Sequence, residues 1–321
     1  MGGVLRYPAT TATALCLLVL TAFYWASGAL SPEELPEYAR SKRQIIGMAL
    51  MLIAMPSYLL AAGFVAQRRS LELVEGLRPQ LPEARFADDA LAAIRGGLAR
   101  SWRYGVAVGI VFGLLNSQPI HAIVDSRAPA IDISIALGQM LLWLLAGLLL
   151  GVRVTSARAF DRMGEVVRFE LFQIHELRPL ARSGSLDVLM IAGALALSPL
   201  QALDAEFRWY NYRFALLISI PAALVLLLWP LRSVHRRISV EKQGRLAQLE
   251  ALIHAARDRA TLEGVLQLET LLAHRDRLRD QKTWPLSTAL ISRVLLYLVI
   301  PPLAWAGAAL VEKGVDWLIS S

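Results

Sequence analysis

The sequence predicts an all-α fold, a polytopic membrane bundle of about seven transmembrane helices with cytoplasmic helical extensions. Three observations predict it. Hydrophobic residues make up 56% of the 321 residues, and charged residues only 18%. The apolar residues stand in unbroken blocks of roughly 20 residues, the length that a helix needs to cross a bilayer. The charges are confined to the stretches between these blocks, a pattern typical of spans and loops.

Seven blocks reach or approach the length of a span: 11–30, 45–66, 104–124, 130–152, 186–203, 214–231 and 285–311. The first block could instead be the apolar core of a cleaved signal peptide, with Ser27-Gly28-Ala29 as its cleavage site. Because this block is long for a signal peptide, we interpret it as a retained span.

The blocks divide the chain into alternating membrane and loop regions. Residues 1–66 hold the first two spans, 104–152 the third and fourth, 186–231 the fifth and sixth, and 285–321 the seventh with a short outer tail. The loops between them are 67–103, 153–185 and 232–284. All three are long enough to form helices of their own.

The basic residues predict the orientation of the chain. The N-terminal residues and the three long loops together carry 25 Lys and Arg residues, and the opposite side carries seven. By the positive-inside rule the N-terminus is cytoplasmic and the C-terminus lies outside. The same asymmetry explains the net charge of +7, so a lipid bilayer rather than a nucleic acid is the expected partner. The Arg-rich composition suggests a bacterial inner (plasma) membrane.

The long loops show helical periodicity. In 153–185, apolar residues recur every three or four positions, at Phe160, Met163, Val167, Leu171, Ile174 and Leu177. The fourth span is therefore expected to continue as one helix until Pro179. In 67–103 we expect a break at Pro79 and Pro82 and then a helix over 88–103. In 232–284 we expect a helical hairpin that turns near 257–261. These helices either pack together as a cytoplasmic layer or lie flat on the lipid headgroups.

Polar residues within the spans are the first candidates for a functional site, because polar groups in hydrocarbon need partners or a cavity. Candidates for a pore are Asn116, Gln118, Gln139 and Gln201. Candidates for an outer vestibule are His121, Asp125, Asp204 and Glu206. The alternative is that these side chains form ordinary hydrogen bonds between helices.

The seventh block carries the remaining candidates. Pro301 and Pro302 are consecutive and fall near its middle, where they break the helix and free backbone carbonyls that could line a pore. Arg293 lies eight residues into the block. It either reaches the cytoplasmic interface and anchors the helix, or it is buried and needs a carboxylate such as Asp187.

The sequence carries no pattern of a catalytic, metal or cofactor site. Its five histidines are dispersed without a second ligand nearby, and its one cysteine lies inside an apolar block. No glycine-rich phosphate loop or nucleophile motif is present. We therefore expect no metal, no cofactor and no enzyme activity; a lipid-acting membrane enzyme is the alternative.

Two functions fit these features. The first is a homo-oligomeric ion channel or channel-like receptor with a pore near the last helix. In layout alone the chain resembles insect odorant and gustatory receptors, which are tetrameric cation channels whose last helix lines the pore. The alternative is a membrane scaffold or sensor whose cytoplasmic helices, chiefly 232–284, dock a partner protein. Pro301, Pro302 and the polar residues in the spans favour the channel.

Overall fold

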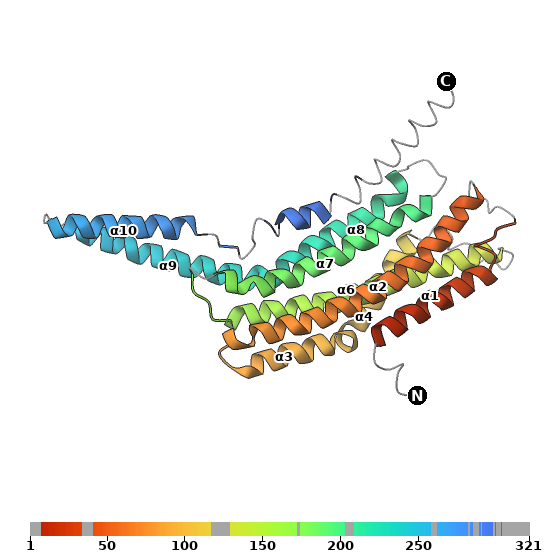
Figure 1. Ribbon diagram of the computed structural model, residues 1–321, viewed down its shortest axis with the longest axis horizontal. Coiled ribbons are helices and arrows are strands. Elements are labelled where there is room, and N and C mark those ends of the chain that lie inside the picture. The colour runs from red at the N-terminus through yellow and green to blue at the C-terminus, as the bar shows by residue number, and fades with distance from the viewer. Residues whose placement is uncertain are drawn as a thin grey trace, which may run out of the picture.

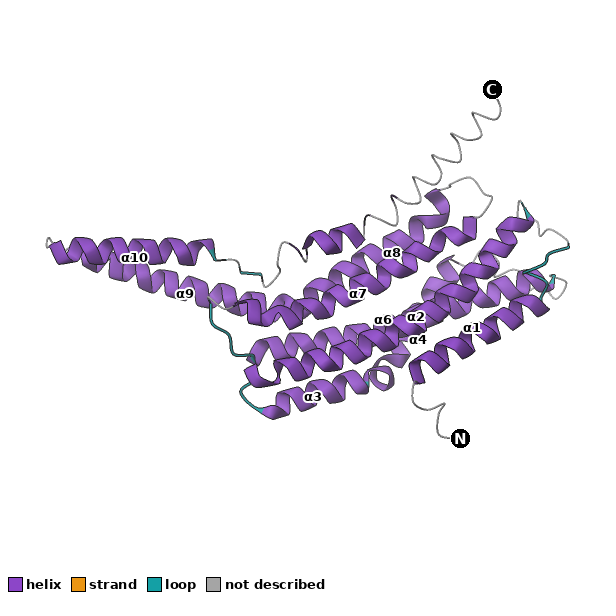
Figure 2. Cartoon of the chain, viewed as in Figure 1, coloured by secondary structure: helices purple, strands orange, loops and turns teal. Residues whose placement is uncertain are grey.

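In the computed structural model the chain forms an elongated bundle of helices (Figure 1). The structure describes residues 8–33, 41–116, 129–171, 174–202, 209–257, 262–281, 283–284, 289, 291–297, 299 and 303. Among these residues all regular structure is helical and no strand occurs (Figure 2). The all-α prediction is confirmed.

Six helices are long and apolar enough to cross a membrane. They are α1 (Pro8–Ala26), α2 (Lys42–Leu77), α4 (Gly97–Asn116), α6 (Ala130–Val166), α7 (Arg178–Leu197) and α8 (Trp209–Leu228). They coincide with the first six apolar blocks of the sequence. The seventh block lies almost entirely outside the described residues, so a seventh span stays a prediction.

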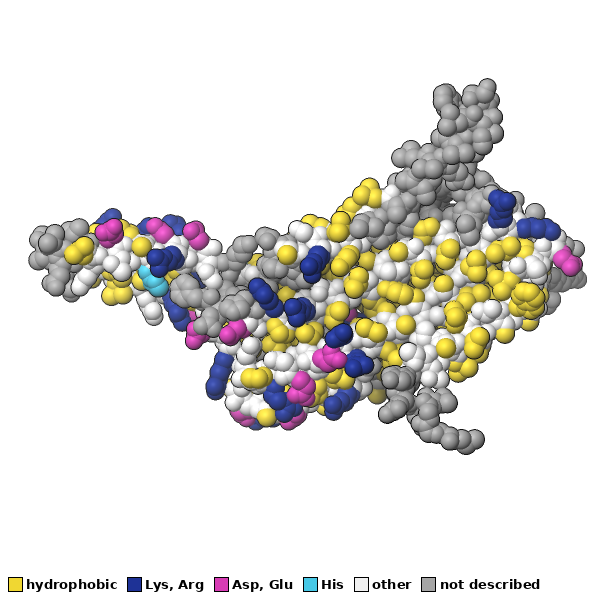
Figure 3. Space-filling view, viewed as in Figure 1, with side chains coloured by type: hydrophobic (Ala, Val, Ile, Leu, Met, Phe, Trp, Pro, Cys, Tyr) yellow, Lys and Arg dark blue, Asp and Glu magenta, His cyan; other side chains and the backbone are white. Residues whose placement is uncertain are grey.

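Large apolar side chains are exposed along these spans. Leu18, Trp25 and Leu217 are 66 to 70% exposed, and hydrophobic side chains are densest on the part of the bundle away from the end formed by α9 (Arg232–Arg257) and α10 (Leu262–Asp280) (Figure 3). Soluble monomers rarely expose apolar patches of this size, whereas lipid covers them in a membrane protein. The chain therefore has the surface of a protein embedded in a membrane.

Two of the helices are longer than a bilayer is thick. α2 has 36 residues and α6 has 37, so at 1.5 Å per residue each is about 55 Å long, against about 30 Å of hydrocarbon. Both extend beyond the apolar region at the same end of the bundle. We call this part the basic end: the ends of α2 and α6, η2 (Arg78–Gln80), α3 (Ala84–Arg95), η3 (Ile174–Leu177), the start of α7, and the hairpin described next.

A helical hairpin projects from the basic end (Figure 1). α8 passes through η5 (Trp229–Leu231) into α9 (Arg232–Arg257), and α10 (Leu262–Asp280) returns along α9. Two paired helices agree with the hairpin expected for 232–284, and the expected turn near 257–261 lies almost entirely outside the described residues. Because α8 and α9 follow each other without a loop, the hairpin is a continuation of a membrane span.

Glycines bring the backbones of α4 and α6 into contact. Gly105, Gly109 and Gly113 recur every four residues on α4, on the face that meets α6. A Cβ atom added at Gly109 would lie 2.7 Å from Cα of Leu144, and one at Gly147 would lie 2.6 Å from the backbone N of Gly109. Small residues at this spacing allow the closest packing between membrane helices. No larger side chain fits at Gly109 or Gly147.

One helix is shorter than the sequence predicted. The fourth span was expected to continue to Pro179, but α6 ends at Val166. Val167 has extended backbone angles (φ −56°, ψ 136°), and the N–H of Arg168 donates to the carbonyl of Gln80 at 2.8 Å. The apolar periodicity reflects burial rather than helix, since Val167, Leu171 and Leu177 are at most 1% exposed. Pro179 begins α7 instead of ending a helix, because proline is tolerated in a first helical turn.

The 67–103 loop also differs in detail from the expectation. The break at the two prolines occurs: α2 ends at Leu77 and η2 follows. The helix expected over 88–103 is divided, however, with α3 ending at Arg95 and α4 beginning at Gly97. Gly96 leaves the helical conformation (φ −84°, ψ 10°), and its N–H bonds back to Ala92. The chain therefore turns at Gly96, before it enters the third span.

Candidate functional site

A buried ion pair joins three helices where the spans pass into the basic end. Arg153 on α6 donates through Nε to Oδ1 of Asp187 on α7, and through Nη2 to Oγ of Ser70 on α2 at 3.0 Å. The side chains of Arg153 and Asp187 are 1% and 2% exposed. Among the described residues Nη1 of Arg153 has no hydrogen-bond partner. We call Ser70, Arg153 and Asp187 the three-helix cluster.

The three-helix cluster ties together helices that are distant in sequence. Charges removed from water carry a large desolvation cost, and only a close partner offsets it. Asp187 supplies that partner for Arg153, and the Ser70 hydroxyl satisfies one further N–H. α2, α6 and α7 are therefore held in one relative position at this level.

A hydrophobic core lies at the basic end. It unites the apolar faces of the predicted helices, including Val74, Leu77, Ile94, Phe160, Met163, Val167, Leu171, Leu177 and Ile238. Val74, Leu77 and Ile94 are completely buried. Helices that lie flat on the headgroups would bury their apolar faces in lipid and would not pack them against one another. The basic-end helices thus form the packed layer, the first of the two alternatives.

Polar contacts fix the base of the hairpin to this core. Arg237 Nη1 donates to the carbonyls of Gly164 and Val167 at 3.1 and 2.8 Å, near the end of α6. The backbone N–H of Ser233 donates to Oδ1 of Asp161 at 3.1 Å. Gln281, just after α10, donates through Nε2 to the carbonyl of Leu171 at 2.8 Å. Both helices of the hairpin are therefore anchored at the end that lies next to the bundle.

The far part of the hairpin exposes apolar side chains. Leu252 and Leu266 are 55% and 58% exposed. Leu252 and Leu266 line a shallow groove between α9 and α10 together with Ala255, Ala256, Gln267, Thr270 and Leu271. Lys and Arg side chains also gather on the basic end and the hairpin (Figure 3). Exposure of this apolar groove to water is unfavourable in free energy.

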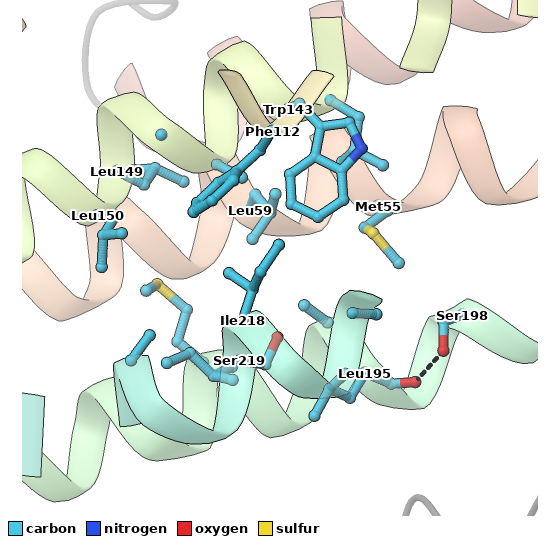
Figure 4. A pocket seen from close by; sticks show the side chains of 18 of the residues that line it. Met55, Leu59, Phe112, Trp143, Leu149, Leu150, Leu195, Ser198, Ile218 and Ser219 are labelled. Carbon is cyan, nitrogen blue, oxygen red and sulfur yellow. Dashed lines mark hydrogen bonds between the residues drawn. The ribbon is translucent and has the colours of Figure 1, made fainter. Parts of the chain in front are cut away.

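A cavity of about 180 Å³ lies within the membrane-spanning part of the bundle. Figure 4 shows its walls: side chains of α2, α4 and α6, among them the ring of Trp143, face those of α7 and α8. Phe112 meets Trp143 edge to face, with ring centroids 5.7 Å apart. Most lining residues are apolar; the polar exceptions are Gln139, Ser198, Gln201 and Ser219.

The structure brings two of the predicted pore candidates together. Gln139 on α6 and Gln201 in η4 (Ser198–Ala202) both line this cavity. The Oε1 atom of Gln139 is buried without a hydrogen-bond partner among the described residues. Asn116 is the last residue of α4, and its side chain lies outside the described part of the structure.

Arg293 does not line the cavity that Gln139 and Gln201 share. It lies in a helical stretch over 291–297, and its side chain is exposed. The carboxylate proposed to neutralise it, Asp187, pairs with Arg153 instead. Asp187 is thus not available to Arg293, and the role of Arg293 stays a prediction. The sequence analysis missed Arg153 because it placed this residue at the start of a loop.

The remaining candidates lie outside the described residues. These are Gln118, His121, Asp125, Asp204, Glu206, Pro301 and Pro302. The expected vestibule and the expected break in the seventh span thus remain predictions. Within the described part of the chain, no group of three or more His, Cys, Asp or Glu side chains is placed to hold a metal ion.

The chain was compared with protein-family models, curated proteins and solved structures. It matches none of them. The six apolar helices and the exposed apolar surface identify a membrane-type helical bundle. Any finer function has to be argued from the geometry.

Proposed function

We propose that this protein is a membrane scaffold or sensor whose projecting hairpin, α9–α10, docks a partner protein. The observation that carries the proposal is an apolar groove on a rigidly anchored projection. The base of the hairpin is fixed by Arg237, Ser233 and Gln281, while Leu252 and Leu266 farther out expose more than half of their surface. A protein partner would remove this apolar surface from water.

The connection between membrane and hairpin supports a sensing role. A continuous helical path of 43 residues, Ala215–Arg257, links the sixth span to the tip of α9. α7 packs against α8 and is tied to α2 and α6 through the three-helix cluster. A displacement of α8 in the membrane would therefore move the hairpin as well.

The channel hypothesis has less support from the described residues. Its pore was expected along 285–311, almost all of which lies outside them. The cavity inside the bundle has walls that are largely hydrocarbon, and ions cross a membrane along polar groups or water. Arg153 and Asp187, the charged pair inside the bundle, neutralise each other. We therefore place docking before conduction.

The proposal requires the basic end to face the cytoplasm, as the positive-inside rule predicts. With Cys16 replaced by serine, single cysteines can be placed at Ser31, Glu83 and Gln243, three exposed positions. In intact cells a membrane-impermeant maleimide should label Ser31→Cys and leave Glu83→Cys and Gln243→Cys unlabelled until the cells are opened. Labelling of the last two from opposite faces would overturn the topology.

Site-directed photocrosslinking tests the docking surface. A photoreactive phenylalanine at Leu252 or Leu266 in the full-length chain should give one discrete adduct with a second protein in cells. The adduct formed at Leu266 should fall at least about tenfold when Leu252→Glu is added, because a buried charge in an apolar contact is costly.

Glu250 is the matched control position. It is exposed on the same helix but lies two residues, or about 200°, from Leu252. A photoreactive residue at Glu250 should give little adduct, and Glu250→Lys should leave the adduct at Leu266 unchanged. Equal crosslinking at Glu250 and Leu252, or an adduct with only a second copy of this chain, would contradict the proposal.

A further inference from the structure

The cavity within the bundle has the size and lining of a binding site. Its volume of about 180 Å³ is close to that of an engineered cavity of about 150 Å³ that binds benzene. Five α-helices and the short helix η4 contribute to its walls; the α-helices are α2, α4, α6, α7 and α8. The site therefore accommodates one ring with a few attached groups.

The lining favours an aromatic occupant. The rings of Phe112 and Trp143 lie on one side of the cavity (Figure 4). Three thioethers, those of Met51, Met55 and Met190, also line it. Methionine sulfur makes favourable contacts with aromatic rings, and its flexible side chain adapts to the shape of a ligand. Aromatic side chains add edge-to-face contacts with a bound ring.

The polar residues of the cavity add a requirement for one hydrogen-bonding group. The buried Oε1 of Gln139 lacks a donor among the described residues, and an unsatisfied polar group in a membrane interior is costly. Ser219, on the opposite wall, directs its hydroxyl toward the space between the two groups of helices (Figure 4). Gln139 lines the cavity, and a turn of its amide toward the space would let Oε1 accept from a ligand hydroxyl or N–H, which a pure hydrocarbon cannot supply.

We infer that this cavity binds a small aromatic molecule that carries a single hydroxyl or N–H group, of the phenol or indole class. Binding contacts both α6 and α8, so an occupant separates or draws together the two walls of the bundle. The inference concerns the membrane part of the chain alone. It stands or falls independently of whether the hairpin docks a partner.

Photolabelling of the purified full-length protein in detergent or nanodiscs tests the inference. The probe is a phenol with a trifluoromethyl-diazirine group in the para position; the comparison probe is the same molecule without the hydroxyl. The phenol should label peptides of α6, α7 or α8 that line the cavity, and excess indole or phenol should compete. Labelling by the probe without the hydroxyl should be about five- to tenfold weaker.

Variants at the cavity wall provide the second readout. Ala194→Phe and Ala222→Phe, both on lining residues, should reduce phenol labelling at least about tenfold because they fill the space. Gln139→Leu should bring phenol labelling down to the level of the probe without the hydroxyl. Leu217→Phe is the control, because Leu217 lies on the same helix as Ala222 with 69% of its surface exposed, and it should change nothing.

The wild-type competition experiment keeps the inference testable even if a filling variant does not fold. Labelling that excess indole or phenol does not reduce would overturn it. So would equal labelling by the two probes, or labelling of the cavity by a diazirine fatty acid that phenol does not displace, which would assign the cavity to a lipid chain.

Discussion

Replacement of Arg153 by methionine should be among the most destabilising single substitutions in this chain. It leaves the carboxylate of Asp187, 2% exposed, without its cation. Removing one partner of a buried ion pair costs about 3–5 kcal/mol, because the remaining charge keeps its desolvation penalty. We expect Arg153→Met, and likewise Asp187→Leu, to lower the thermal unfolding midpoint of the detergent-solubilised protein strongly, measured as loss of the monodisperse peak in size-exclusion chromatography.

Two further variants separate the ion pair from a general effect of losing an arginine. Arg69 pairs with Glu72 on the surface of α2, where both side chains are largely exposed (62% and 44%). Arg69→Met should therefore cost less than about 1 kcal/mol. The double variant Arg153→Met/Asp187→Leu should recover most of the loss, since apolar replacement of a buried pair is often near neutral. A double variant that loses as much as the sum of the two single variants would contradict this account.

Substitution of Gly147 by alanine should also destabilise the bundle, by about 3 kcal/mol, at the upper end of what overpacking costs. The added methyl group would collide with backbone atoms of Gly105 and Gly109 on α4. Backbone cannot move aside as a flexible side chain can, so the two helices would have to separate along their whole contact. The measurement is again the thermal midpoint, together with proteolysis of the loosened α4.

Gly76 provides the matched control for this substitution. It is also a helical glycine, near the end of α2, but no atom lies within 4 Å of the position of an added Cβ. Alanine is favoured over glycine in a helix by about 1 kcal/mol, so Gly76→Ala should raise the midpoint slightly. Opposite signs at Gly147 and Gly76 are the expected result; a loss of stability at both, or at neither, would contradict the close packing of α4 on α6.

The sequence predicted the parts of the fold that depend on local pattern. Runs of apolar residues located the six described spans, because their length alone has to match the bilayer. The apolar periodicity of 153–185 identified buried side chains correctly and the helix end incorrectly. The reason is that the end of α6 depends on a contact distant in sequence, the hydrogen bond from Arg168 to Gln80.

The candidate site was less accessible from the sequence. Gln139 and Gln201 could be singled out as polar residues in spans, but their meeting at one cavity depends on how η4 packs against α2. The pair of Arg153 and Asp187 left a signal that was available, namely two opposite charges at the same end of neighbouring spans. A rule that pairs such charges before assigning them to loops would have found the three-helix cluster.

The glycine contact between α4 and α6 also determines which parts of the bundle can rearrange. Two backbones in direct contact cannot slide past one another by a fraction of a turn, since there is no space for a Cβ atom where Gly109 and Gly147 meet the opposite helix. α4 and α6 therefore keep their relative position and move as one rigid unit. α7 and α8 keep more freedom to move and can tilt about Asp187. Because α9 continues α8, a small tilt in the membrane would displace the tip of the hairpin by a larger distance, in proportion to the length of α9.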